Sequence, residues 1–432
     1  MLDLRLIRHD PDRVRRGLAA RGDDAAAVDA ILGMDRRRRE LLVQVEELKA
    51  ERNRVSKEIA EIKRLGGNGS PLIALMRSKS GDVRTLEQEV REVDDELEAA
   101  LYAIPNLPAD DVPSGLDENY NRMVRSSGSP PELGFSPKPH WILGTSLGIL
   151  DFDAAAKMSG ARFVVFKGPG ARLERSLINF YMDENEKAGF IPIQPPAIVT
   201  REALIGSAHL PKFEQDQFKL ANGDLFLTPT AEAQLTNLHR DEILEAATLP
   251  RLYCAFTPCF RAEAGAAGKE TRGIIRQHWF DKVELYAVCA PEQGPDLLER
   301  LTAQAEHLIK ALALPYRITL LCASEMGFAA AKTYDIEVWF PALGKYLEVS
   351  SVSLCGDFQA RRAAIRYRPA PGAKAEFAHT LNGSGLAVGR PYAAILENYQ
   401  QPDGSITIPE VLHPYMGGIT TIQHRGSEEA IK

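Results

Sequence analysis

The chain contains 432 residues, 44% of them hydrophobic, and its 52 Lys and Arg residues against 59 Asp and Glu residues leave a formal net charge of −7. This length predicts two or three domains with a sizeable core, and the composition excludes a disordered, collagen-like or disulfide-rich chain. The charge excludes a generally basic nucleic-acid binder, although it is compatible with a local basic surface.

The cysteine spacing bears on metal binding, and the apolar runs bear on the location of the protein in the cell. The five cysteines lack the paired spacing of a zinc or redox site, so we expect reduced, buried thiols and no zinc. The N-terminal residues mix acids and bases, and no apolar run approaches the roughly 18 residues that span a bilayer. The sequence therefore predicts a cytoplasmic protein without a membrane segment.

The first quarter of the chain carries two runs of apolar residues spaced alternately three and four apart, over residues 31–62 and 83–104. This spacing predicts two coiled-coil helices, with Arg38 and Arg52 on the first seam. The glycine-rich residues 66–71 between them predict a chain reversal, with Ser70 as N-cap and the following proline in the first turn. We therefore expect an antiparallel helical hairpin that projects as an arm.

The charges of this arm have two interpretations. The first helix is rich in arginine and lysine but also contains acids, and the second helix is more acidic. The charges can form salt bridges within the hairpin, or they can form a basic edge that meets phosphates. The spacing alone leaves both interpretations open.

Two proline-rich stretches, residues 104–115 and 126–139, separate the arm from a globular remainder. There we predict strands at residues 162–167, 252–256, 334–340, 346–351 and 406–408, and helices at residues 173–188, 295–313 and 391–400. The strands alternate apolar and polar residues in the manner of an antiparallel sheet.

The densest group of functional side chains lies in residues 260–284. Arg261 and Glu263 are two apart on an expected strand, and a small-residue loop, 264–268, follows. On the returning strand, alternation places His278, Phe280, Lys282 and Glu284 on one face, and Trp279, Asp281 and Val283 on the other. Cations, an aromatic ring and a carboxylate on one face suit a nucleotide together with a small zwitterion.

A second glycine-rich segment, residues 383–389, lacks the glycine spacing of a dinucleotide-binding loop. It precedes Arg390 and a predicted helix. A glycine turn followed by an arginine at a helix start suits a phosphate group.

Together these stretches closely resemble the bacterial-type seryl-tRNA synthetases, a class II family, over essentially the whole chain. Residues 189–196 resemble motif 1, which the family uses at its dimer interface; residues 260–284 resemble motif 2; and residues 379–390, with the sequence NGSGLAVGR, resemble the seryl form of motif 3. The resemblance implies an α+β fold. An N-terminal antiparallel α-helical coiled-coil arm that binds tRNA would span residues 1–108. A catalytic domain on an antiparallel β-sheet flanked by helices would span residues 109–432.

The resemblance also implies an activity. The family uses ATP and Mg²⁺ to convert L-serine to seryl-adenylate with release of pyrophosphate, and then transfers serine to tRNA(Ser), and to tRNA(Sec), with release of AMP. The serine carboxylate is already ionised, so no general base is required, and catalysis rests on positioning and charge stabilisation. The family is homodimeric, and we expect the same here.

Residue roles follow from the matching motifs. As catalytic residues we expect Arg261 to bind the α-phosphate and the serine carboxylate, Arg390 to bind the γ-phosphate, and Glu348 with Ser351 to hold Mg²⁺. The expected ATP site comprises Arg261, Ala262, Glu263, Gln277, Phe280, Glu348, Val349, Ser350, Ser351 and Arg390, with Phe280 stacked on adenine. The expected serine site comprises Thr230, Ala231, Glu232, Glu284 and Ser384.

The resemblance gives the arm a role in binding the long variable arm and elbow of the tRNA, mainly through shape and phosphate contacts. This favours RNA contact by some of the residues Arg36, Arg37, Arg39, Arg54 and Lys57. For the seam residues Arg38 and Arg52 we expect a structural role.

Seven positions depart from the family pattern near the expected site: Ala233, Gln234, Trp279, Ser324, Glu325, Val352 and Leu354. They indicate either ordinary drift or a divergent copy that tolerates a seryl-adenylate mimic. For Trp279, strand alternation predicts an effect on packing rather than on the nucleotide.

Two other functions fit parts of the pattern. A ligase that loads an amino acid onto a carrier protein would lack the arm, and a non-catalytic RNA-binding regulator would have lost Arg261, Glu348 or Arg390. The arm and all three residues are present. The sequence therefore favours the tRNA-charging enzyme.

Overall fold

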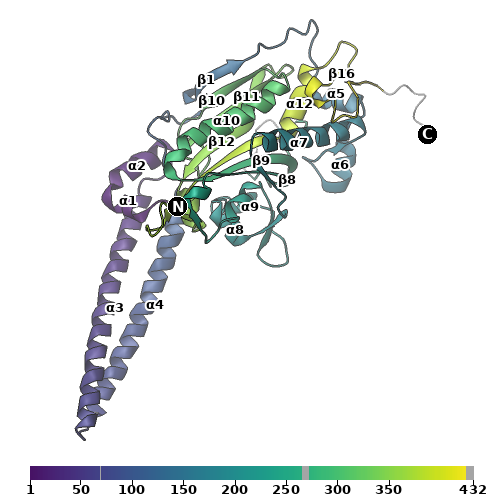
Figure 1. Cartoon of the computed structure of the whole chain (residues 1–432). Coiled ribbons are helices and arrows are strands. Elements are labelled where there is room, and N and C mark those ends of the chain that lie inside the picture. The colour runs from purple at the N-terminus through teal and green to yellow at the C-terminus, as the bar shows by residue number, and fades with distance from the viewer. Residues whose placement is uncertain (69, 265–271, 425–432) are drawn as a thin grey trace. The chain divides into compact units, whose positions relative to one another are not determined.

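The computed structural model describes residues 1–68, 70–264 and 272–424 (Figure 1). Residue 69 of the predicted reversal and residues 265–268 of the predicted small-residue loop lie outside the described residues. The chain divides into two compact units, Leu2–Pro105 and Asn106–Lys432, with Met1 belonging to the second.

The N-terminal unit is entirely helical, with α1 (Leu4–His9), α2 (Pro11–Ala20), α3 (Ala27–Arg64) and α4 (Ser70–Ala103). The long helices α3 and α4 pack against each other (Figure 1). Leu41, Val45 and Val55 of the predicted seam are buried between them, and Arg38 pairs with Asp94 of α4. The predicted hairpin is confirmed, and α4 begins one residue earlier than expected.

The second unit is built on an eight-stranded sheet in the order β1-β10-β11-β12-β15-β9-β8-β4. These strands are β1 (Arg122–Ser127), β4 (Ile191–Ile193), β8 (Arg251–Phe260), β9 (Trp279–Cys289), β10 (Tyr316–Leu320), β11 (Lys332–Phe340), β12 (Lys345–Gly356) and β15 (His379–Ala387). Every neighbouring pair is antiparallel except β4 and β8, which are parallel. The expected antiparallel sheet is therefore confirmed, apart from this edge strand.

Three amphipathic helices cover one face of the sheet: α7 (Pro169–Lys187), α10 (Gly294–Ala311) and α12 (Gly389–Asn398) (Figure 1). Their apolar side chains pack on the alternate sheet residues that face them, among them Val283, Ile336 and Val352, and form the main core. The intervening residues of β9, β12 and β15 face the other way and line a cavity.

The remaining helices are α5 (His140–Ser146), α6 (Phe152–Ser159), α8 (Arg201–Gly206), α9 (Glu232–Asn237) and α11 (Phe358–Arg362). The remaining strands are β2 (Leu150–Asp151), β3 (Val165–Phe166), β5 (Ile198–Thr200), β6 (Leu225–Leu227), β7 (Ile243–Glu245), β13 (Arg366–Arg368), β14 (Glu376–Phe377), β16 (Ile406–Thr407) and β17 (Thr421–Ile422). The predicted strand at 162–167 is wrong except for β3, because Arg162 has a left-handed φ of 63° that no strand accommodates. Within the described residues, no helix has the length and apolar character needed to cross a membrane.

Candidate functional site

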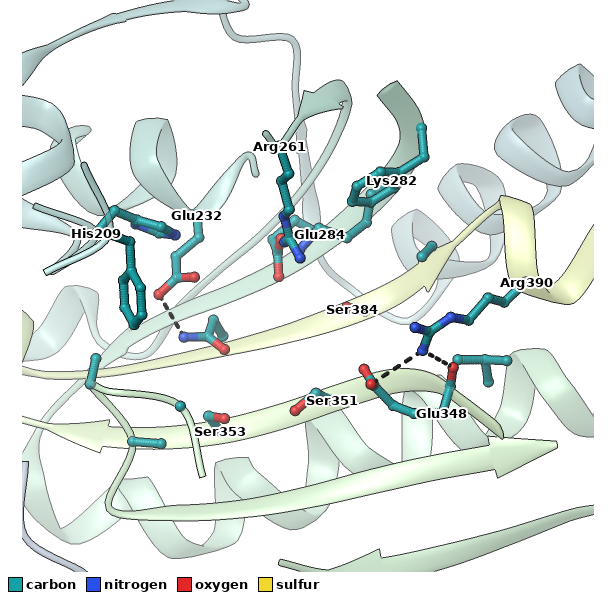
Figure 2. A pocket seen from close by; sticks show the side chains of 18 of the residues that line it. His209, Glu232, Arg261, Lys282, Glu284, Glu348, Ser351, Ser353, Ser384 and Arg390 are labelled. Atoms are coloured by element: carbon teal, nitrogen blue, oxygen red, sulfur yellow. Dashed lines mark hydrogen bonds and ion pairs between the residues drawn. The ribbon is translucent and has the colours of Figure 1, made fainter. Parts of the chain in front are cut away.

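A cavity of about 450 Å³ lies on the sheet face opposite α7, α10 and α12 (Figure 2). Three adjacent strands, β9, β15 and β12, form its floor, and the start of α12 and several connecting segments form its walls. Its volume is that of a typical small-molecule site. Among its lining residues are Arg261, Glu263, Gln277, Phe280, Lys282, Glu284, Glu348, Val349, Ser351, Ser384 and Arg390.

Strand β9 presents its side chains as its alternation predicts. Phe280, Lys282 and Glu284 line the cavity, whereas Trp279 faces a separate cavity beside α7. His278, which precedes the strand, does not line the cavity, and its Nδ1 lies 3.0 Å from the carbonyl oxygen of Arg261. The face prediction is therefore confirmed for the strand itself but not for His278.

The predicted strand through Arg261 and Glu263 is wrong. Strand β8 ends at Phe260, and Glu263 has a left-handed φ of 51°. The Arg261 side chain is instead held by its Nε, which donates to the carbonyl oxygen of Pro229 at 3.3 Å, and its guanidinium lies 5.2 Å from the centre of the Phe280 ring. The cation thus reaches the cavity from beyond the strand end, over the aromatic floor.

A β-bulge in β12 aligns two residues that regular alternation would separate. Ser350 pairs with Ile336, but the next paired residue is Glu348, so Val349 is an extra residue in this strand. Without a bulge, residues three apart point to opposite faces of a strand. Here both Glu348 and Ser351 line the cavity.

The oxygen atoms at this end of the cavity suit Mg²⁺. Glu348 and Ser351 offer a carboxylate and a hydroxyl, and Asp335, paired across from Ser351, accepts a hydrogen bond from it. One Asp335 oxygen is buried without a partner within the described chain, and burial, followed by the nearby Glu348, raises the pKa of this carboxyl. No cluster of three or more His, Cys, Asp or Glu residues suited to a metal occurs in the described ranges. Two oxygen ligands fit Mg²⁺, which takes its other ligands from water and phosphates.

Arg390 stands at the start of α12 and points back over β12. Its guanidinium donates to the Glu348 carbonyl oxygen at 2.5 Å, lies 3.2 Å from the Glu348 carboxylate, and donates to Ile275 O at 3.2 Å (Figure 2). The predicted helix start is confirmed, but the predicted glycine turn is wrong, because residues 383–387 belong to β15. A Cβ at Gly385 would lie 2.9 Å from Asn185 and Leu285, so close packing explains this glycine.

Two carboxylates line the rest of the cavity: Glu284 is buried near its centre, and Glu232 is half-buried toward the end where His209 lies (Figure 2). Glu284 receives a hydrogen bond from the Thr230 hydroxyl and an ion pair from Lys282. Glu232 Oε1 receives hydrogen bonds from Asn382 at 2.7 Å and from Gln359 at 2.5 Å. Burial, and secondarily the charge of Glu284, raises the pKa of Glu232 to about 7. This arrangement can bind a small molecule with an ammonium group and a hydroxyl.

Four expected site residues do not line the cavity. Thr230 donates to Glu284, as described, and Ala231, which directly precedes α9, is buried in a smaller core. The Ala262 N–H donates to the Asp216 carbonyl, and the Ser350 hydroxyl donates to Ser384 O at 2.7 Å. These residues support the cavity wall from behind.

Gln359 is one of the residues that the sequence analysis missed. Its amide donates to Glu232 and, at 3.1 Å, to the carbonyl oxygen of Ser207, while its own oxygen accepts from Thr380 at 2.7 Å and Tyr286 at 3.3 Å. This fully buried, fully bonded amide fixes Glu232 relative to the segment after α8. No local pattern marks it, because its partners come from four distant parts of the chain.

His209, Phe213 and Asn382 were also missed, although all three line the cavity. Asn382 lies within the quoted motif 3 segment, so its position was available from the sequence. His209 and Phe213 follow α8 in a segment without periodicity, and only the folded chain brings them to the site.

None of the seven departures from the family pattern is among the described residues that line the cavity. Val352 and Leu354 alternate with the lining residues of β12 and pack into the main core, and Ala233 is buried in a smaller core. Any effect of Val352 and Leu354 on the cavity would therefore act through the packing of the core beneath it. Trp279 faces away from the nucleotide face, as expected.

Known proteins match the chain along almost its whole length. The family model for the seryl-tRNA synthetase N-terminal domain matches residues 1–108, and that for the tRNA synthetase class II core domain (G, H, P, S and T) matches residues 213–399. The serine–tRNA ligase of Exiguobacterium sibiricum is 51% identical, covering 98% of this chain and 100% of that protein. The serine–tRNA ligase of Syntrophomonas wolfei is 52% identical, covering 98% and 99%.

Solved structures agree with this match. The seryl-tRNA synthetase of Pyrococcus horikoshii complexed with ATP superposes with a TM-score of 0.92 at 38% identity, covering 99% of this chain and 100% of that chain. The cytoplasmic serine–tRNA ligase of Naegleria fowleri in complex with AMP gives a TM-score of 0.88 at 28% identity, covering 99% of each chain.

Proposed function

The chain belongs to the class II seryl-tRNA synthetases, and on this premise we propose that its cavity activates L-serine with ATP and transfers the serine to tRNA(Ser). The observation that carries this proposal is the order of groups along one cavity: Arg390 and Glu348 at one end, Arg261 next to Glu284 in the middle, and Glu232 toward the other end (Figure 2). This order suits a triphosphate next to an amino acid.

In the first step, a serine carboxylate oxygen attacks the α-phosphorus of ATP and pyrophosphate leaves. Both reactants are anionic, so cations must offset their repulsion. Arg261 offers a planar guanidinium to the carboxylate and the α-phosphate, and Arg390 takes the distal phosphates. Glu348 and Ser351 would hold Mg²⁺, which supplies further charge neutralisation when bound. Phe280 offers its ring to the adenine.

Serine selection is assigned to the buried carboxylates. Glu284, already bonded to Thr230 and Lys282, retains acceptor capacity for the serine hydroxyl or ammonium, and Ser384 lines the same part of the cavity. Alanine would leave these buried groups unpaired, and this loss is the physical basis for rejecting it.

We assign the contacts with macromolecular partners to two surfaces, the helical arm and the edge of the sheet. We assign tRNA contact to the arm, and among its expected residues Arg36 and Lys57 are exposed and form no ion pair within the described chain. Arg37, Arg39 and Arg54 already pair with acids of the arm. We also propose tRNA(Sec) as a second acceptor, a cytoplasmic location, and a homodimer formed through residues 189–196, where Ile191 is exposed on the edge strand β4.

The test is serine-dependent ATP–pyrophosphate exchange with alanine, threonine and glycine as controls, followed by charging of bacterial tRNA. Exchange with serine alone and charging of serine acceptors are expected. Exchange without charging would instead indicate a ligase for another acceptor, such as a carrier protein. A folded protein with no exchange would contradict the proposal and favour a non-catalytic regulator.

A further inference from the structure

One segment of the cavity wall connects the phosphate end of the cavity to a buried histidine behind it. Residues 274–277 shortly precede β9, and all four line the cavity. The carbonyl oxygen of Ile275 accepts from Arg390 Nε at 3.2 Å, and Arg276 forms an ion pair with Glu263. The course of this backbone therefore decides where two guanidinium groups lie. The roles assigned so far do not explain what holds it in place.

His140 holds the start of this segment. It is the first residue of α5 and is fully buried. The backbone N–H of Ile274 donates to His140 Nε2 at 3.2 Å. A backbone N–H can only donate, so Nε2 carries the lone pair and Nδ1 carries the ring proton. Nδ1 lies 2.8 Å from Glu397 Oε1 and donates to it.

Glu397 in turn fixes the imidazole to α12. This carboxylate is fully buried near the end of the helix. Its Oε1 also accepts from the backbone N–H of His140 at 3.1 Å, and its Oε2 accepts from the Ala342 N–H at 3.0 Å. Arg390 lies at the other end of the same helix. The contacts that leave α12 at Arg390 and pass through residues 274–277 and the imidazole thus return to α12, and this closed path resists a shift of the segment.

The backbone around the imidazole is shaped for this contact. Gly273 has a left-handed φ of 72°, and a Cβ there would lie 2.2 Å from His140 Nε2. Only glycine allows the backbone to pass this close. Ile274 is 2% exposed and packs in the main core, so bulk water does not replace the histidine as the acceptor for its N–H. A buried N–H without an acceptor is costly, so loss of the imidazole would favour movement of the segment.

We propose that His140 is a positioning residue for ATP binding: it fixes residues 274–276, and through the carbonyl oxygen of Ile275 it directs the Arg390 guanidinium toward the distal phosphates. This inference rests on the proposed function and adds a residue to its first step. His140 does not line the cavity, so it acts through the segment and not on the substrate. The carboxylates assigned to serine belong to β9 and α9 instead. ATP and serine should therefore respond differently when the histidine is changed.

The test measures serine-dependent ATP–pyrophosphate exchange in the full-length enzyme. His140→Asn keeps a donor near the Nδ1 position for Glu397 but has no acceptor for Ile274, whereas His140→Gln places an amide oxygen near the Nε2 position. We expect His140→Asn to raise the KM for ATP by about tenfold, the value of one buried hydrogen bond, and the KM for serine by less than about twofold. His140→Gln should recover most of the affinity for ATP.

Inhibition by AMP tests the route through Arg390. AMP lacks the distal phosphates that we assign to this arginine, so its inhibition constant in the same assay should change by less than about twofold in His140→Asn. Equal weakening of ATP and AMP would overturn the inference, because the loss would then lie at the adenosine or the α-phosphate.

A second variant reaches the same contact from the other side. Gly273→Ala adds a Cβ against His140 Nε2 and displaces the Ile274 N–H. It should reproduce the difference between ATP and serine, and it provides the test if His140→Asn does not fold. A Gly273→Ala enzyme with the parent KM for ATP would overturn the inference.

His239→Asn is the matched control. His239 is also buried and also paired with a glutamate, since its Nδ1 lies 2.8 Å from Glu242 and its Nε2 lies 2.8 Å from the Tyr253 hydroxyl, but it does not line the cavity. Both KM values should stay at those of the parent. Equal changes for ATP and serine in His140→Asn, or the same ATP effect in the control, would show a merely structural role and overturn the inference. A parent enzyme without serine-dependent exchange would instead contradict the proposed function.

Discussion

At the scale of single residues, the most unusual group in the cavity is Glu232. Its Oε1 is occupied by Asn382 and Gln359, whereas no bond to Oε2 is recorded within the described residues. Its ordinary pKa near 4.5 is raised to about 7, chiefly by burial and then by Glu284. Around neutral pH the carboxyl therefore changes between a neutral form and an anion, and only the anion would attract the serine ammonium in the proposed reaction.

This titration predicts a pH dependence. The charged groups facing Glu232 are Glu284, Lys282 and Arg261, and His209 stays neutral. Because a raised carboxyl pKa means protonation below about 7, kcat/KM for serine in pyrophosphate exchange should rise as the pH increases from about 6 to about 8. Glu232→Gln should lower activity and flatten this rise. The exposed Glu245→Gln serves as control, and a parent profile that is already flat would contradict the assignment.

At the scale of elements, the bulge in β12 determines the site more than any single residue. It turns the carboxylate of Glu348 to the same face as the Ser351 hydroxyl, next to Arg390. In a regular strand the Glu348 side chain would leave this face, and the cavity would lose the carboxylate that we propose as a Mg²⁺ ligand. The extra residue thus adds a charged oxygen to the proposed phosphate end of the cavity.

Metal dependence tests this placement. Glu348→Gln replaces a charged oxygen ligand with a weak one, so the Mg²⁺ concentration for half-maximal exchange should rise by about tenfold or more. Binding of Mn²⁺ in the presence of ATP, followed by electron paramagnetic resonance, should weaken in parallel. Glu337→Gln is the matched control, since Glu337 pairs across from Glu348 but binds Arg317. Equal effects of the two substitutions would show that the site lies elsewhere.

The elements also show where prediction from the sequence succeeds. The seams of α3 and α4 and the alternation of β9 depend on local periodicity, and both predictions are confirmed. Leu41 of the first seam is buried, and Lys282 of β9 lines the cavity. The strand assumed for Arg261 failed because local spacing does not reveal where a strand ends. The glycines of β15 were misassigned to a turn because their cause is close packing against distant parts of the chain: Gly383 is approached by Val352, and Gly385 by Asn185, about 200 residues away.

The residues of the candidate site also divide into those that the sequence predicted and those that it did not. The residues named from the resemblance supplied most of the charged lining, including Arg261, Glu348 and Arg390. His209 and Gln359 were missed, because their roles arise from tertiary contacts that leave no periodic trace. The bulge at Val349 escaped prediction for a related reason: it depends on how β12 pairs with β11.

At the scale of the whole molecule, a net charge of −7 coexists with an RNA partner. An anionic protein can bind RNA only through a local cationic surface. Arg36 and Lys57 of α3 are suited to this role, because they are exposed and form no ion pair with any residue that the structure describes. The two activities should therefore differ in their response to salt.

Salt dependence tests this division of roles. The KM for tRNA in charging should rise steeply with potassium chloride, because phosphate contacts release counterions, whereas serine-dependent exchange should change little. The double substitution of Arg36 and Lys57 by alanine should reduce the slope of log KM against log salt by about 1 to 2. Arg91→Ala on α4, whose side chain binds Gln88, serves as control. A slope unaffected by the double substitution would place the RNA contacts elsewhere.

The four-way bonding of Gln359 has a consequence for how this enzyme can evolve or be redesigned. Its amide joins Glu232, which we propose binds serine, to Ser207, which begins the segment that carries His209. A substitution at Glu232 alone would leave a buried amide donor unsatisfied and disturb Ser207 as well. Substitutions at these positions should therefore be epistatic, and libraries that seek a new amino-acid preference must vary them jointly.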